Sequence, residues 1–270
     1  MVLALFYGGL AYISFRRGSE FNRLGYFSLG AAIVIFSVAI PVQAGDSAWT
    51  TIGWAAEMVL LVWLSFRLKM QQLRYYGYAV FAFLLGRLLF FDTSVNLHDF
   101  RLILNERVLA FAAGIAAMYL SAYLVWRERD NFGQWKAPAG AFIIAANVFT
   151  LWVLSFESWD YFGSQLLLVR SGSAAANSLR NAQNLSLTIL WTLYAVILLV
   201  IGVVKRWRLL RLGALVLLAI PILKLFVYDV FALERVYRIV AFVGLGLLLI
   251  ISAYLIQRHS KAIRGFLIKK

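Results

Sequence analysis

Cysteine is missing from this 270-residue chain, and histidine, proline and charged residues are scarce. Without cysteine the chain forms no disulfide, iron–sulfur cluster, cysteine zinc site or thiolate nucleophile. The two histidines, His98 and His259, fall on opposite sides of the membrane in the topology derived from charge, which excludes a bis-histidine haem within one chain. The sequence therefore predicts no metal site, no cofactor and no recognisable set of catalytic residues.

The low charge content decides the class of protein. Only 14% of the residues are charged and 63% are hydrophobic, with a mean hydropathy of +0.82. A soluble domain is about half apolar and about a quarter charged. This chain has too few polar side chains to cover a surface that faces water. We therefore predict an all-α, polytopic integral membrane protein, because about 20 apolar residues per helix cross a bilayer.

Hydropathy predicts nine transmembrane helices, each bounded by charged or polar connections. They are expected at 1–15, 26–43, 50–66, 75–91, 107–126, 138–156, 185–204, 209–228 and 236–257. Pro41 and Pro138 fall at span ends, where the missing N–H costs little, whereas Pro221 lies inside the eighth span and should kink it.

The distribution of charge predicts the orientation. Counting Arg211 with its neighbouring loop, one set of alternating connections carries 18 of the 26 Lys and Arg residues but only 3 of the 12 Asp and Glu residues. By the positive-inside rule this set is cytoplasmic, so the N-terminus is outside and the C-terminus inside. The set comprises 16–25, 67–74, 127–137, 205–208 and the basic tail 258–270. Because these loops account for the net charge of +14, we expect membrane lipids and no nucleic acid as partners.

An internal repeat emerges when the chain is compared with itself. Charged and aromatic residues recur at a constant offset of 137 residues, which becomes 131 after the next outer connection. The matches are Trp54 with Trp191, Arg87 with Lys224, Asp92 with Asp229, and Arg107 with Arg238. We therefore predict two parallel four-helix repeats, 26–126 and 138–257, and interpret 1–15 as a leading helix that remains from an earlier copy.

The same residues carry a family resemblance. The segments QNLSLTILW at 183–191 and KLFVYD at 224–229, followed by Tyr237 and Arg238, resemble the C-terminal part of one bacterial membrane-protein family, catalogued as domain of unknown function 2339. WTTIGW at 49–54 is similar to the preceding repeat of that family. The resemblance implies a multi-pass protein of the bacterial inner membrane, either a shortened member or a C-terminal piece of a longer one. The family has no established activity to transfer.

Charged residues inside membrane spans are functional candidates because burying them is costly. Four cations, all predicted in the outer half, could form a pseudo-twofold site for an anionic ligand: Arg87, Arg107, Lys224 and Arg238. Their predicted charge partners are Glu57, Asp92 and Asp229. The alternative is structural: the cations snorkel to the interface or pair with these acids. A direct pair between Arg87 and Asp92 requires the helix to end before Asp92, since five residues turn the two side chains about 140° apart.

Two further features remain open. Glu57 lies well inside a span, where a carboxyl either carries a proton or forms a packing salt bridge with Arg87. The outer loop 157–184 is the longest connection and is expected to be helical from Ala174. It is interpreted either as a plain surface helix or as a lid or docking segment.

Three functions follow from these features. The first is non-enzymatic binding or translocation of an anionic amphiphile, a lipid or lipid-linked glycan, at the outer face. The second is a structural or accessory subunit that packs against other membrane-protein subunits. The third is an enzyme on lipid-linked sugars, with Glu57 and Asp92 as acid and base.

Overall fold

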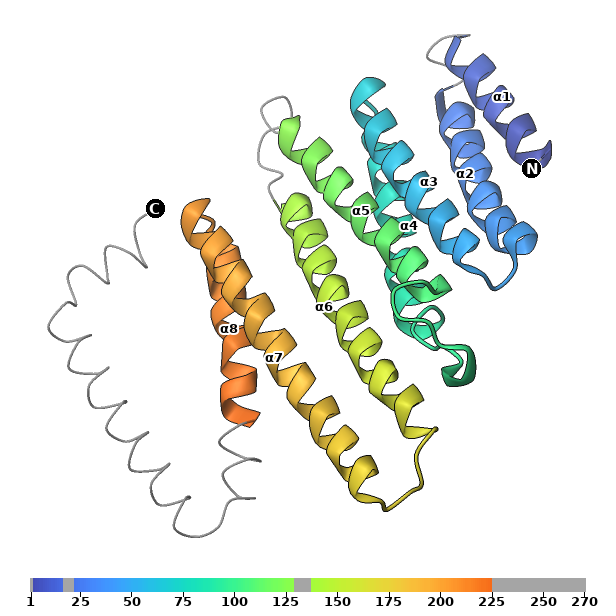
Figure 1. Ribbon diagram of the computed structural model, residues 1–270. Helices are drawn as coiled ribbons and strands as arrows, with labels where there is room; N and C mark the ends of the chain where they lie inside the picture. The colour runs from blue at the N-terminus through green and yellow to red at the C-terminus, as the bar shows by residue number, and fades with distance from the viewer. Residues whose placement is uncertain (1, 17–21, 129–136, 225–270) are drawn as a thin grey trace, which may run out of the picture. The chain divides into compact units, whose positions relative to one another are not determined.

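The computed structural model describes residues 2–16, 22–128 and 137–224 of the chain (Figure 1). All regular secondary structure in these residues is helical, which confirms the predicted all-α class. The elements are α1 (Val2–Arg16), α2 (Asn22–Ala44), α3 (Ala48–Arg67), α4 (Gln71–Phe90), the short 3-10 helix η2 (Leu97–Asp99), α5 (Glu106–Arg127), α6 (Ala137–Leu166), α7 (Ala174–Val204) and α8 (Arg208–Lys224).

The membrane character of the chain is confirmed. Within the described residues, five helices are long and apolar enough to cross a membrane, namely α2, α3, α5, α6 and α7. Helices α1 and α8 are shorter, at 15 and 17 residues, and α4 carries two arginines, Arg74 and Arg87. The expected ninth helix at 236–257 and the basic tail 258–270 lie outside the described residues, so the count of nine spans stays a prediction.

The long outer connection is mostly helix. Helix α6 continues to Leu166 and α7 begins at Ala174, as the sequence predicted for its start, so the connection proper covers only 167–173. Gly172 adopts a left-handed backbone conformation there, with φ of +79°, which a residue without a Cβ accepts most readily. The next residue, Ser173, accepts a hydrogen bond from the backbone N–H of Ala176 and so caps α7.

The chain divides into two compact units, residues 1–187 and residues 188–270. In the first unit α1 packs on α2, α3 packs on α4 and α5, and α5 packs on α6. The core is apolar and includes Met58, Leu84, Phe111 and Phe142, all buried. A Cβ added at Gly114 would lie 3.1 Å from the side chain of Leu88, so a small residue permits this close approach.

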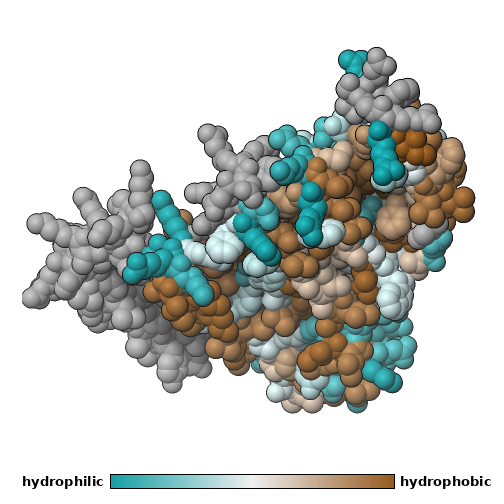
Figure 2. Space-filling view, turned by 90° about the horizontal axis from the view of Figure 1, so that it is seen from above, coloured by the Kyte–Doolittle hydropathy of each residue, from teal (hydrophilic) through white to brown (hydrophobic). Residues whose placement is uncertain are grey.

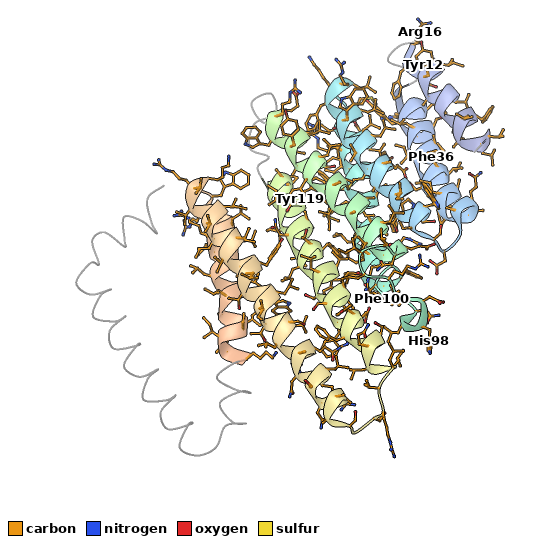
Figure 3. All side chains as sticks on the ribbon, viewed as in Figure 1. Tyr12, Arg16, Phe36, His98, Phe100 and Tyr119 are labelled. Atoms are coloured by element: carbon orange, nitrogen blue, oxygen red, sulfur yellow. The ribbon has the colours of Figure 1, made fainter. Side chains whose placement is uncertain are left out.

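Helix direction defines the two ends of this first unit. Helices α3 and α5 begin, and α4 ends, at the end that we call the network end; His98 and Phe100 mark it near the bottom of Figure 3. At the opposite end, which we call the arginine end, α1, α3 and α5 finish in Arg16, Arg67 and Arg127. Figure 2 looks onto the arginine end and shows hydrophilic side chains among apolar ones.

Candidate functional site: a buried ion-pair network

Arg87, predicted to be a functional cation, lies in the last turn of α4 and is only 8% exposed. Its Nη2 donates to the Asp46 carboxylate and to the Ser47 carbonyl, both at 3.0 Å. Its Nε donates to the Thr51 hydroxyl at 2.9 Å and lies 3.6 Å from the Asp92 carboxylate. The Thr51 hydroxyl in turn donates to Asp92. Arg87 therefore joins the turn before α3, α3 itself and the residues that follow α4.

The pairing of Arg87 with Asp92 follows from where α4 ends. The helix stops at Phe90, and the backbone N–H of Asp92 bonds back to the Arg87 carbonyl at 3.1 Å. This turn brings together two side chains that a continuous helix would hold apart, so the direct pair considered for Asp92 is present. Burial raises the pKa of Asp92, while the Thr51 hydroxyl and the Arg87 guanidinium act in the opposite direction.

Arg107, the second predicted cation, opens α5 and is 2% exposed. Its Nε and Nη2 donate to one oxygen of Glu157, at 3.0 and 2.7 Å, and its Nη1 donates to Asp160 at 2.5 Å. Nη1 also donates to the Thr93 carbonyl at 3.0 Å, one residue after Asp92. The Arg87 and Arg107 clusters are therefore adjacent parts of one network.

Glu157 is held by more than Arg107. It accepts hydrogen bonds from the Asn105 side chain at 2.8 Å and from the Ile103 backbone N–H at 2.9 Å. Asn105 also caps α5, because its side chain accepts from the Val108 N–H at 2.9 Å. The loop before α5 is thereby fixed to α6 as well as to α5.

The charges of this network do not favour an anion. Two guanidiniums face four carboxylates, those of Asp46, Asp92, Glu157 and Asp160. Sequence reasoning identified Asp92 but missed the other three acids. Glu157 and Asp160 were assigned to a loop, although their spacing of three residues places them on one face of a helix. That spacing was the signal that could have found them.

Glu57 occupies a different position. It lies within α3, is 4% exposed, and accepts a hydrogen bond from the Ser37 hydroxyl of α2 at 2.7 Å. Its other oxygen has no hydrogen-bond partner among the described residues. Of the two acids predicted as partners of Arg87, the structure pairs Arg87 with Asp92 and not with Glu57.

Lys224 belongs to the second unit and ends α8. Its Nζ donates to the hydroxyl of Thr188 at 3.0 Å. The separation along the chain is 36 residues, the same as between Arg87 and Thr51. The other two predicted site residues of the second copy, Arg238 and Asp229, lie outside the described residues.

Residues 75–259, more than half of the chain, match the family model described as "Predicted membrane protein (DUF2339)". The chain belongs to this family. The resemblance inferred from the repeat residues is thereby confirmed, and the matched segment includes Arg87, Asp92, Arg107, Glu157 and Lys224. No curated protein and no solved structure matches the chain.

Proposed function

We propose that this DUF2339 protein is a non-enzymatic structural component of the bacterial inner membrane, a helical scaffold of the kind that packs against other membrane subunits. The observation that carries the proposal is the commitment of both buried arginines to carboxylates of neighbouring elements. Each guanidinium contacts two acids, so the network end offers little charge to a substrate and instead ties five segments together. Breaking such buried pairs is strongly destabilising.

The proposal includes the repeat and the orientation. Two parallel four-helix copies, with the N-terminus outside and the C-terminus cytoplasmic, account for the charge pattern. The matching bonds from Arg87 to Thr51 and from Lys224 to Thr188 support the repeat, because both members of each pair correspond at the offset of 137 residues found in the sequence. Labelling single cysteines from either side tests the orientation: Gln165→Cys should react only from outside, and reaction only from the cytoplasmic side would contradict it.

A second candidate is the outward anion site for an amphiphile. Lys224 supports it as the cation that corresponds to Arg87 in the second copy, where its amine donates to the hydroxyl of Thr188. Arg87 and Arg107 support it less, since their carboxylate partners already satisfy them. The enzyme alternative gains nothing from Asp92, which is occupied by Thr51 and Arg87.

The two candidates differ in their response to inorganic phosphate. A scaffold predicts that phosphate leaves the unfolding midpoint of the wild-type protein unchanged in detergent, while Arg107→Ala lowers the midpoint strongly. An outward anion site predicts that phosphate raises the wild-type midpoint and that Lys224→Ala abolishes the rise. The second result would replace the scaffold proposal with the anion site.

A further inference from the structure

We propose that the groove between α3 and α5 binds one anionic glycerophospholipid, with an acyl chain along the helices and the phosphate at Arg67 and Arg127. This site lies at the arginine end and is separate from the ion-pair network. It was not among the sites that the sequence predicted.

The apolar part of the groove has a volume of about 470 Å³. Its walls are formed by one face of each helix, including Ala56, Leu60 and Trp63 of α3 and Ala116 and Leu120 of α5. Alanines on both helices leave the space between them unfilled. Leu60, Trp63 and Leu120 are 50%, 42% and 47% exposed, so the groove is open along its side, as a site that receives lipid from the bilayer must be.

A second hollow, of about 460 Å³, continues this groove to the arginine end. Trp63 lines both hollows, and Leu124 follows Leu120 by one helical turn. The second hollow holds two cations, Arg67 and Arg127, and one acid: its lining is Trp63, Phe66, Arg67, Leu124, Arg127 and Glu128. Its formal charge is therefore positive, and the groove passes from apolar to cationic along its length, as a phospholipid does from tail to headgroup.

The length of the groove agrees with this occupant. From Ala113 to Arg127 the chain advances 14 residues along α5, or about 21 Å at 1.5 Å per residue. Half of the hydrocarbon core is about 15 Å thick, so the groove spans one leaflet and reaches the headgroup region. By the positive-inside rule the arginine end faces the cytoplasm, which assigns the lipid to the inner leaflet.

The guanidinium groups of Arg67 and Arg127 are accessible to a ligand, in contrast to the buried ones of Arg87 and Arg107. Both side chains are exposed, and the Arg67 guanidinium lies 5.7 Å from the ring centre of Trp63. The attraction between a guanidinium and the face of an indole leaves the N–H groups of the guanidinium able to bind a phosphate. The chain provides a matched control in Arg16, which ends α1 at the same end and lies 5.5 Å from the ring centre of Tyr12, but lines neither hollow.

Native mass spectrometry of the full chain, released from vesicles of phosphatidylglycerol and phosphatidylcholine with identical tails, tests the proposal. The wild-type protein should retain one phosphatidylglycerol in preference to phosphatidylcholine. The double variant Arg67→Ala/Arg127→Ala should lose that preference by about tenfold or more, because each cation adds to the attraction of an anionic headgroup. Arg16→Ala should behave as the wild type. If Arg16→Ala lost the preference for phosphatidylglycerol to the same extent, the preference would come from general surface charge, and the proposed site would be wrong.

A second variant tests the apolar part without touching the arginines. Ala116 is exposed and lines the groove, so Ala116→Phe should fill the groove and abolish lipid retention while the protein stays folded. Ala82→Phe, at an exposed alanine of α4 outside the groove, is the control and should retain the lipid. Retention by Ala116→Phe, equal retention of both lipids by the wild type, or a dimer in place of bound lipid would each contradict the proposal.

Discussion

Two pairs of arginines, one pair at each end of helices α3, α4 and α5, differ in their surroundings. At the network end Arg87 and Arg107 are 8% and 2% exposed and contact four carboxylates. At the arginine end Arg67 and Arg127 are exposed and border a groove. Burial with acids gives a cation a structural role, whereas exposure beside an apolar groove makes it available to a ligand.

This comparison shows why position in a membrane span is a poor guide to function. The charges buried inside the bundle attract attention because they are costly to bury, but their cost is offset by partners on neighbouring elements. Arg67 and Arg127 follow the ordinary pattern of basic residues at helix C-termini. Only the groove beside them distinguishes them from Arg16.

The largest effect is expected for Arg107→Ala. The change leaves Glu157 and Asp160, with side chains 7% and 15% exposed, without their cation. We expect a loss of roughly 3–5 kcal/mol in the free energy of unfolding, since one partner of a buried pair is removed. Titration with dodecyl sulfate from mild detergent micelles measures it. Arg101→Ala, an exposed arginine at the same end, is the control, and an equal loss in both would remove the basis of the network.

Arg87→Ala should have a smaller effect, because one of its acids, Asp46, is 78% exposed and water can solvate it. We expect a loss of roughly 1–3 kcal/mol from the unsatisfied Asp92 and Thr51. The double variant Arg87→Ala/Asp92→Ala should recover part of this loss when both are compared by the same titration. If the loss in the double variant equals the sum of the losses in Arg87→Ala and Asp92→Ala, the pair between Arg87 and Asp92 contributes nothing to stability.

Two threonines test the repeat. Thr51→Val and Thr188→Val each remove the hydroxyl that accepts from the cation of its copy, and each should cost about 1 kcal/mol. Thr51→Val should cost more, because Thr51 also donates to Asp92. Chemical or thermal unfolding of the two variants shows whether the copies respond alike. If Thr188→Val left the free energy of unfolding unchanged, the bond from Lys224 to Thr188 would not have the role that the bond from Arg87 to Thr51 has in the first copy.

The smallest effect on stability is expected for Glu57→Gln. The amide retains an oxygen for the Ser37 hydroxyl and removes a buried charge, so the midpoint of unfolding should stay the same or rise. Thermal unfolding at pH 7 measures it. A large loss would indicate that Glu57 pairs with a cation, and would restore the salt-bridge interpretation.

Helices were predictable because apolar runs and charged ends are local properties of the chain. The starts of α3 and α5 lie within two residues of the predicted spans. Helix α7 begins at Ala174, where the sequence predicted helix ahead of the span at 185–204. Helix α6 continues ten residues beyond its predicted end at 156. Hydropathy predicted the end there because polar and charged residues follow, but Glu157 and Asp160 remain helical and pair with Arg107 of α5.

The site was harder to predict because it depends on contacts between distant segments. The Arg87–Asp92 pair could be predicted from the sequence, since the two residues flank the C-terminal end of one helix. The partners Asp46 and Glu157 come from other elements, 41 and 50 residues away from their arginines. The groove is set by the spacing of α3 and α5, which no single helix encodes.

The most direct test of this difference between the ends is the unfolding midpoint of three proteins, each measured with and without phosphatidylglycerol. The wild type should gain stability from the lipid, since a ligand of the folded state raises the midpoint. Arg107→Ala should start lower but gain as much, whereas Arg67→Ala/Arg127→Ala should start at the wild-type midpoint and gain nothing. Loss of the lipid effect in Arg107→Ala, or its persistence in the double variant, would contradict the account.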